Sequence, residues 1–274
     1  MPYVTYDNIR ALISTGNEQS LSTGNYKVLY ATNFTANNTA QLKRVKRIGQ
    51  ELDYYIQTGP KSSSVSVSVI PVTGVGINQF ADFFSLTGDF VSGSYIQVPS
   101  YRFDKCFLKS MSINIEPWKV ISANLDFDSY GLATGSGIYS FSAEDATLQV
   151  VNELIPLSFR ETTISFSTLN SQQQIKEYES INFSLDVERL TNYEIGSEYP
   201  AKASVGKITK SLQINGISNI DWLSDFEPKH SVTATITIAN GYSFSVAGIL
   251  NAQTLSIDGN GVAKGGLQIV EEMV

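Results

Sequence analysis

A strand–turn–strand pattern that occurs twice constrains this chain more than any other feature of its sequence. Residues 103–127 and residues 244–270 each read as a strand, a turn and a second strand. Apolar and polar side chains alternate in 110–115 and again in 254–258, and Pro117 marks the first turn. A period of two with turn residues between the strands predicts a β-hairpin. Two matching hairpins about half a chain apart therefore predict a duplicated β domain.

We predict a mainly β protein built from two tandem domains, residues 1–140 and residues 141–274. Each domain is expected to be a β-sandwich or half-barrel, and the glycine-rich stretch 130–149 is the best candidate for the linker. The two copies should superpose, with 62–70 matching 207–215 and 107–127 matching 249–269.

Little helix is expected. Asp7 can cap a short helix with Ile9, Leu12 and Ile13 on one face, and segments 77–86 and 220–226 are candidates for one short helix in each domain. Two long polar excursions, 35–60 and 191–206, are predicted to be loops between strands.

The charge distribution excludes one class of function. The chain carries a net charge of −7, with +1 in residues 1–140 and −8 in residues 141–274. A protein that reads nucleic-acid sequence needs a basic surface, which this chain lacks. No apolar run approaches the length of a membrane-spanning helix, and residues 1–10 do not resemble a secretion signal, so we expect folding in a reducing cytoplasm.

The residues that usually carry catalysis are scarce. His230 is the only histidine and could serve as a catalytic base, but it precedes a strand, where a solvated histidine is the commoner case. Cys106 is the only cysteine, so a cysteine-rich metal site is not available. Asp126 and Asp128 alternate with apolar residues and could pair as glycosidase carboxylates or bind calcium, although solvated carboxylates on a polar sheet face are commoner. We therefore expect neither an enzyme nor a cofactor.

Residues 155–216 carry a resemblance to a known family. They contain a proline-led strand, a long strand and a Gly-Ser-x-Tyr-Pro turn formed by Gly196, Ser197, Tyr199 and Pro200. In this order the chain resembles the tail tube (major tail) proteins of long-tailed bacteriophages, and residues 26–130 are similar in layout.

The resemblance implies a structural subunit of a virion tail, assembled in the host cytoplasm. In that family each domain has a short helix, the inner sheets of neighbours join into a β-barrel ring, and stacked rings form a tube whose lumen conducts DNA. A double-domain subunit would need three chains for a pseudo-sixfold ring. The implied partners are further copies of the chain, the tape-measure protein, the tail terminator and baseplate proteins.

The resemblance also implies that rings stack through a long loop. The cluster Lys43, Arg44, Lys46 and Arg47 lies in the first polar excursion, and we expect it to contact an acidic surface of the next ring around Glu194 and Glu198.

Two alternatives stay open at this point. Duplicated tube domains also build baseplate hub or distal tail adaptor proteins. A carbohydrate-binding β protein would instead need an aromatic platform, for which Trp118, Trp222 and Tyr242 are the candidates.

Overall fold

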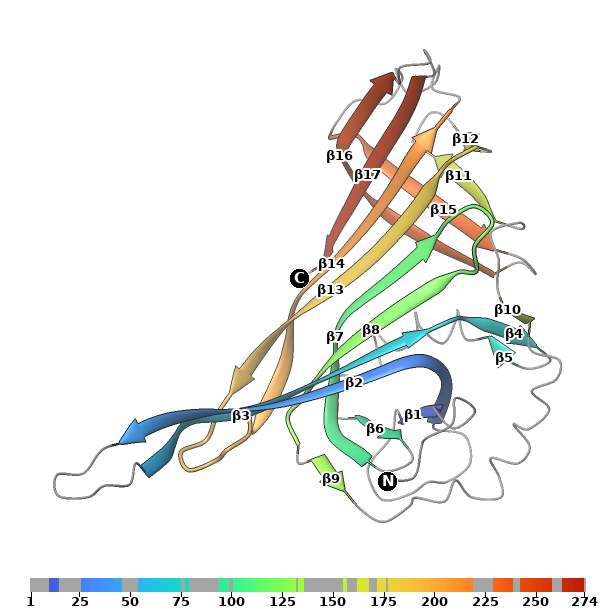
Figure 1. Cartoon of the computed structure of the whole chain (residues 1–274). Helices are drawn as coiled ribbons and strands as arrows, with labels where there is room; N and C mark the ends of the chain where they lie inside the picture. The colour runs from blue at the N-terminus through green and yellow to red at the C-terminus, as the bar shows by residue number, and fades with distance from the viewer. Residues whose placement is uncertain are drawn as a thin grey trace.

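The computed structural model describes residues 10–14, 26–45, 54–74, 77–78, 94–98, 101–131, 133–135, 155–156, 162–167, 172–175, 177–218, 229–238, 242–257 and 263–273. Figure 1 shows the whole chain. Its strands are β1 (Arg10–Ser14), β2 (Tyr26–Val45), β3 (Tyr54–Val69), β4 (Val72–Gly74), β5 (Ile77–Asn78), β6 (Ser94–Val98), β7 (Tyr101–Ile115), β8 (Ser122–Ser129), β9 (Ala133–Gly135), β10 (Ile155–Pro156), β11 (Thr163–Ser167), β12 (Gln172–Ile175), β13 (Ser180–Asn192), β14 (Lys202–Ile217), β15 (Ser231–Ile238), β16 (Tyr242–Ile257) and β17 (Ala263–Met273).

The fold is mainly β, as predicted, and the described residues contain no helix. One 14-stranded antiparallel sheet follows the order β12-β11-β15-β16-β17-β14-β13-β7-β6-β1-β2-β3-β8, with β9 beside β7 and a further pairing between β7 and β8. A small second sheet joins β10, β4 and β5. Strands from the two halves of the sequence therefore share one hydrogen-bonded sheet.

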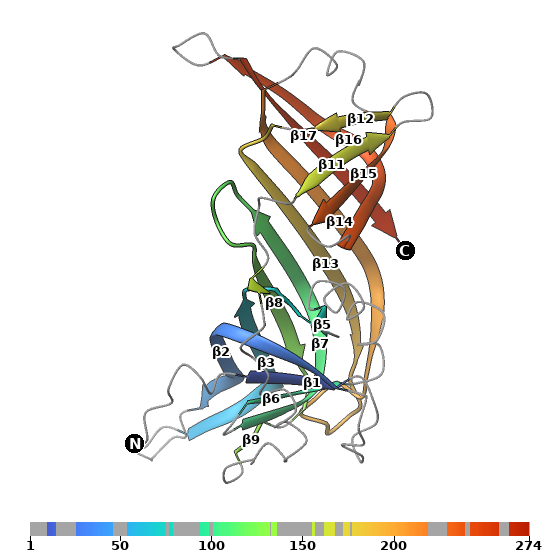
Figure 2. The ribbon, with the colours of Figure 1, turned by 90° about the vertical axis from the view of Figure 1, so that its right-hand side faces the viewer.

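The alternation along the strands decides which face is buried. Val65, Val67 and Val69 are buried on β3, while the serines between them are exposed or half-buried. The sheet also bends back over its own apolar face, so that β11 and β15 run across β13, β14 and β17 (Figure 2). Strands with this alternation bury one face of the sheet and leave the other exposed to solvent. The buried residues of both halves form one apolar cluster.

The same strand order occurs twice along the chain. In the first half the pairings run β2-β3-β8-β7-β6-β1 and return to β2. In the second half they run β13-β14-β17-β16-β15-β11-β12, and β12 leads along the chain into β13. The pair β12 and β13 thus takes the place of the single strand β2. Each half holds the same antiparallel circuit, which we call a unit.

Two of the register shifts in the sheet recur at matching places in the two units, whereas others, such as that between Ala31 and Asn33, occur in one unit alone among the described pairings. The register between β7 and β8 shifts between Leu108 and Ser110, and that between β16 and β17 shifts between Leu250 and Ala252. Likewise, the β2–β3 register shifts from Ala40 to Leu42, and the β13–β14 register shifts from Val187 to Arg189. The second pair of shifts differs in size, since β3 skips residues 58–60 and β14 skips residues 206–207. Both pairs of shifts nevertheless align the units in the same register, which agrees with the pairing of β3 with β8 and of β14 with β17. Leu108 then corresponds to Leu250, and Ala40 corresponds to Val187.

Three details differ from the sequence-based expectations. The helix expected at residues 9–13 is wrong, because Arg10–Ser14 form β1 and pair with both β2 and β6, so sheet pairing overrides the helical spacing. The excursion at 35–60 is largely a hairpin, since β2 continues to Val45 and β3 begins at Tyr54. The excursion at 191–206 is a hairpin as well.

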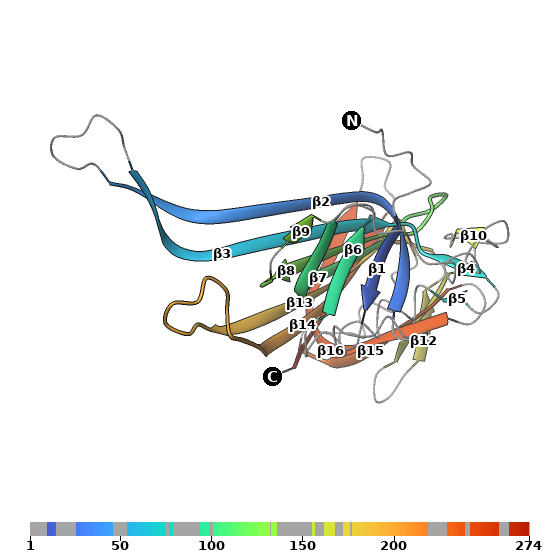
Figure 3. The same ribbon diagram turned by 90° about the horizontal axis from the view of Figure 1, so that it is seen from below.

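The hairpins were missed for a physical reason. Residues 35–39 are exposed and mostly polar, so this part of the strand carries no apolar alternation. The two long hairpins project from the same side of the molecule (Figure 3). The helices expected at 77–86 and 220–226 fall mostly or wholly outside the described residues, and the domain boundary at residue 140 stays a prediction.

Candidate assembly interface

The sheets of the two units join through an antiparallel pairing of β7 with β13, which we call the internal seam. Six residue pairs form it, from Ser110 opposite Asp186 to Ile115 opposite Ile181. The apolar members of the seam are buried, including Ile113 at 1 % exposure and its partner Phe183 at 2 %. Backbone pairing and apolar burial together hold one unit to the other in a fixed register.

A charged residue lies at the end of the internal seam. Arg189 donates a hydrogen bond from Nη2 to the carbonyl of Leu108 at 3.1 Å, and its guanidinium carbon lies 5.3 Å from the centre of the Phe107 ring. A guanidinium over an aromatic face is a favourable cation–π arrangement. Its Nε and Nη1 are buried without a hydrogen-bond partner among the described residues. The burial of this cation at the end of the seam therefore carries an unfavourable desolvation free energy.

Asp128 compensates part of that charge. Burial raises the pKa of the Asp128 carboxyl, while the charges of Lys109 and Arg189 act in the opposite direction. Burial also lowers the pKa of the Arg189 guanidinium, against the charges of Tyr130 and Asp128. The charge of each group therefore stabilises the ionised form of the other.

Among the strand edges without a neighbour in the described residues, two lie at the positions that correspond to the internal seam. On one side β2 pairs with β3, but on the other side it pairs with β1 only through Tyr26–Tyr30, so its edge is unpaired from Ala31 onward. Similarly β16 pairs with β17 from Ile249 to Ile257. The other edge of β16 meets β15, and the residues just before β15, only as far as Leu250, so it is unpaired from there to Ile257. Unpaired edges of this length are sites for strand addition.

The side chains along the β16 edge are exposed where their counterparts are buried. Leu255 and Ile257 are 65 % and 68 % exposed. The alignment of the bulges places them where Ile113 and Ile115 lie in the first unit, and both of these are 1 % exposed within the internal seam. Exposed apolar residues on an unpaired strand edge make this edge a candidate interaction surface.

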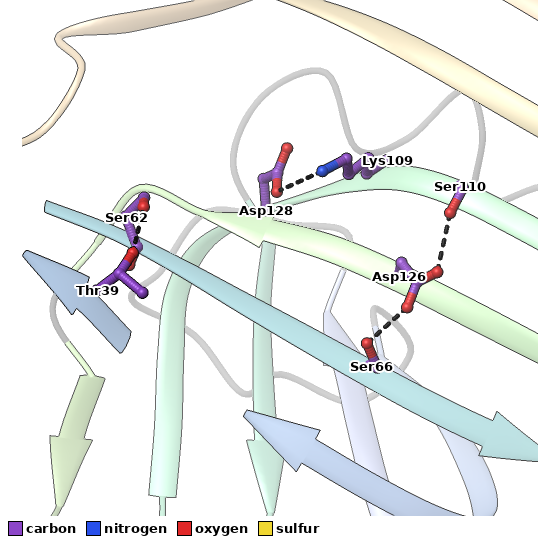
Figure 4. A network of polar contacts seen from close by, with 7 residues as sticks. All are labelled: Thr39, Ser62, Ser66, Lys109, Ser110, Asp126 and Asp128. Carbon is purple, nitrogen blue, oxygen red and sulfur yellow. Dashed lines mark hydrogen bonds and ion pairs between the residues drawn. The ribbon is translucent and has the colours of Figure 1, made fainter. Parts of the chain in front are cut away.

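The opposite face of the sheet is polar. Asp126 accepts hydrogen bonds from Ser66 at 2.6 Å and Ser110 at 2.9 Å, so one carboxylate links β3, β8 and β7 (Figure 4). Lys109 lies 3.7 Å from Asp128 on the same strands. Asp126 and Asp128 thus lie on the polar face, as the alternation predicted. Both carboxylates are engaged with side chains of their own sheet.

The acidic residues predicted to contact a neighbouring ring lie on the exposed turn between β13 and β14. Lys61 donates to Glu198 of the same chain twice, from its backbone N–H at 3.0 Å and from Nζ at 2.5 Å. The side-chain hydrogen bond raises the pKa of Lys61. Glu194 is exposed nearby. The turn between β13 and β14 is therefore bonded to β3 of its own chain at Lys61.

The four basic residues predicted to contact that turn are not brought to it by the described structure. Lys43 and Arg44 belong to β2, with side chains outside the described residues, and Lys46 and Arg47 lie wholly outside them. Their contact with another ring stays a prediction.

Sequence reasoning missed the residues that shape the interface most. Arg189 follows no motif, and the unpaired edges become visible only when the strand order is known. The alternation around Leu255 and Ile257 was the one available signal, but it does not say that these residues are exposed.

The remaining sequence candidates form no chemical site among the described residues. His230 is exposed just before β15, and Cys106 is buried, where loss of solvation raises its pKa to about 12. Trp118 is 84 % exposed in the β7–β8 turn with φ +64°, whereas Trp222 and the side chain of Tyr242 lie outside the described residues. The described part of the chain also holds no cluster of three potential metal ligands.

Comparisons with other proteins add no family. A scan of the chain against protein-family models gives no match, and a search of curated proteins gives none either. The part of the chain that the structure describes also contains no helix of the length and hydropathy needed to cross a membrane.

Proposed function

We propose that this protein is a structural subunit of a bacteriophage tail tube, in which copies join edge to edge into rings and the rings stack around a lumen. In this proposal each unit is one tail-tube-like domain of a tandem pair, completed by a short helix. The proposal rests on the internal seam more than on any other observation. Two units with the same strand order already share a continuous sheet within one chain.

The seam supports a ring because it uses only half of the available edges. Joining two units consumes one edge of β7 and one edge of β13, while the corresponding edges of β16 and β2 stay unpaired in the described chain. Further copies can pair these edges without any change of fold. A ring also removes exposed strand edges, which otherwise promote aggregation.

The polar face supports a lumen for DNA. The strands next to the internal seam present serine, asparagine and aspartate on this face, including Asn182, Ser112 and Asp126. Phosphate backbones bind surfaces rich in lysine and arginine. Serine, asparagine and aspartate predominate on this face, and its Lys109 is paired with Asp128, so we expect DNA to pass without being held.

The test is electron microscopy of the purified full chain. We expect rings or stacked tubes of uniform diameter, in which each chain contributes two similar densities to the wall. Three chains in a ring would give the pseudo-sixfold wall that the resemblance implies. A species that stays monomeric at high concentration, with no ring under any ionic strength, would overturn the proposal.

A baseplate adaptor would differ in one respect. Such a protein forms single rings that do not stack on themselves, whereas a tube subunit adds ring upon ring. The same micrographs therefore distinguish the two assignments.

A further inference from the structure

We propose that β16 of one copy pairs with β2 of the next in one defined register, which repeats the internal seam between chains. In this register residues 252–257 lie antiparallel to residues 34–39, with Leu255 opposite Ala36 and Ile257 opposite Phe34. We call this the external seam. The inference deepens the proposed function and rests on it, since it names the partner edge and the residues that meet.

The register follows from two independent correspondences within the chain. The first aligns β7 with β16 at their bulges, and by the same interval along the strand Ile113 corresponds to Leu255. The second aligns β13 with β2 at their bulges, and in the same way Phe183 corresponds to Ala36. Because Ile113 pairs with Phe183 in the internal seam, Leu255 lies opposite Ala36 in the external seam.

The chemistry of the two edges agrees with this register. Ala36 and Phe34 lie opposite the buried Val65 and Val67, so they belong to the apolar face, as Leu255 and Ile257 do by correspondence. The residues between them are polar on both strands, and the register also sets these against each other. A slip of one residue would set Phe34 against Ser256 and Leu255 against Thr35, so that apolar side chains oppose polar ones.

The two seams differ at the position of the buried cation. By the alignment of the two units, Leu42 corresponds to Arg189 and Val270 corresponds to Asp128. Ile249 corresponds to Phe107, the ring beneath the Arg189 guanidinium. Both charged members are thus replaced together by apolar residues. Ile249 is 55 % exposed in the single chain, in contrast with the buried Phe107. An apolar contact suits a seam that must form between separate molecules, because it carries no cost of burying a charge.

The exposed polar pair Asn37 and Thr254 allows a direct test by disulfide trapping. The variant carrying Asn37→Cys and Thr254→Cys places two cysteines directly opposite each other across the external seam, within bridging distance for an antiparallel pair. We expect mild oxidation of assembled protein to give a ladder of covalent multimers on a non-reducing gel. Reduction should return the single chain. Cys106 is buried and remains in every variant as a common background.

Two matched variants make the test specific for the register. Ser112→Cys with Ser184→Cys is the equivalent pair in the internal seam, and it should give a disulfide within one chain and no ladder. The second variant combines Asn37→Cys with Ser256→Cys. Ser256 lies two residues beyond Thr254 on the same face of β16, so its cysteine is beyond the usual reach of a disulfide to residue 37. This variant should give at most a weak ladder.

The outcomes separate this inference from the proposed function. Rings without a ladder from the 37–254 pair, or with an equal ladder from the 37–256 pair, overturn the register and leave the tube assignment standing. Absence of rings overturns the tube assignment, and the external seam is then judged by the ladder alone. A ladder from the 37–254 pair, with an intrachain bond from the 112–184 pair, supports the seam.

Discussion

Arg189 and Asp128 lie where backbone pairing between the units ends, and each carries a charge that burial penalises. The chain has Leu42 and Val270 at the matching positions of the proposed external seam. The same scaffold therefore accommodates either a charged or an apolar pair, and the residues at the two positions are expected to depend on each other. Removing one charge from such a pair is more damaging than removing both.

This dependence can be measured by a double-mutant cycle. Arg189→Leu alone removes the hydrogen bond to the Leu108 carbonyl and a charge that favours ionised Asp128, so we expect a loss of about 2 kcal/mol in unfolding free energy. Adding Asp128→Val should recover part of that loss, with a coupling of roughly 1 kcal/mol. Urea unfolding of the four proteins, followed by circular dichroism, gives the cycle. Strictly additive effects would show that the two residues act independently.

At the scale of the strands, β16 depends on a close approach to its neighbour at Gly248. A Cβ atom at this position would lie 2.3 Å from the carbonyl oxygen of Val270, closer than real Cβ contacts allow. The obstacle is backbone, so no side-chain rotation can relieve it. The residue lies shortly before the bulge at which β16 leaves β15 and becomes the unpaired edge.

We expect Gly248→Ala to destabilise the protein by about 1–3 kcal/mol through this steric conflict. Thermal unfolding of the variant measures the effect. Ala247→Ser, at the neighbouring exposed position, is the matched control and should change stability by less than about 0.5 kcal/mol. Equal melting temperatures for the glycine variant and the parent would contradict the close approach.

The strands also show how far sequence reasoning reaches. Alternating residues such as Val65, Val67 and Val69 predicted both the strands and their buried face, because period-2 patterning depends on local sequence alone. Strand β1 was misread as a helix, since its pairing with β2 and β6 is non-local. The unpaired edges and the role of Arg189 depend on strand order, which no local pattern contains.

At the scale of the whole molecule, substitutions on the exposed apolar edge of β16 should affect assembly without affecting the stability of the single chain. Leu255→Asp with Ile257→Asp should leave the unfolding free energy of the single chain nearly unchanged, because both side chains are exposed. The charges should nevertheless abolish ring formation, since each would be buried against the next copy. Analytical ultracentrifugation measures assembly, and denaturant unfolding measures stability.

The corresponding residue of the internal seam provides the contrast. Ile113→Ala removes side-chain volume from a buried position and should cost about 2–5 kcal/mol. The Asp double variant would contradict the proposal if it assembled as well as the parent, or if it lost as much stability as Ile113→Ala.

The difference between the edges of β2 and β16 restricts the symmetry that the protein can adopt. A two-fold dimer joins identical patches, but each contact in the proposed external seam would join two dissimilar patches, an arrangement called heterologous. Heterologous contacts generate either cyclic assemblies or open helical filaments, depending on the rotation that relates successive copies. The copy number is then set by the twist across the internal and external seams, so a substitution that alters this twist would change the circumference of the tube while every chain keeps its fold.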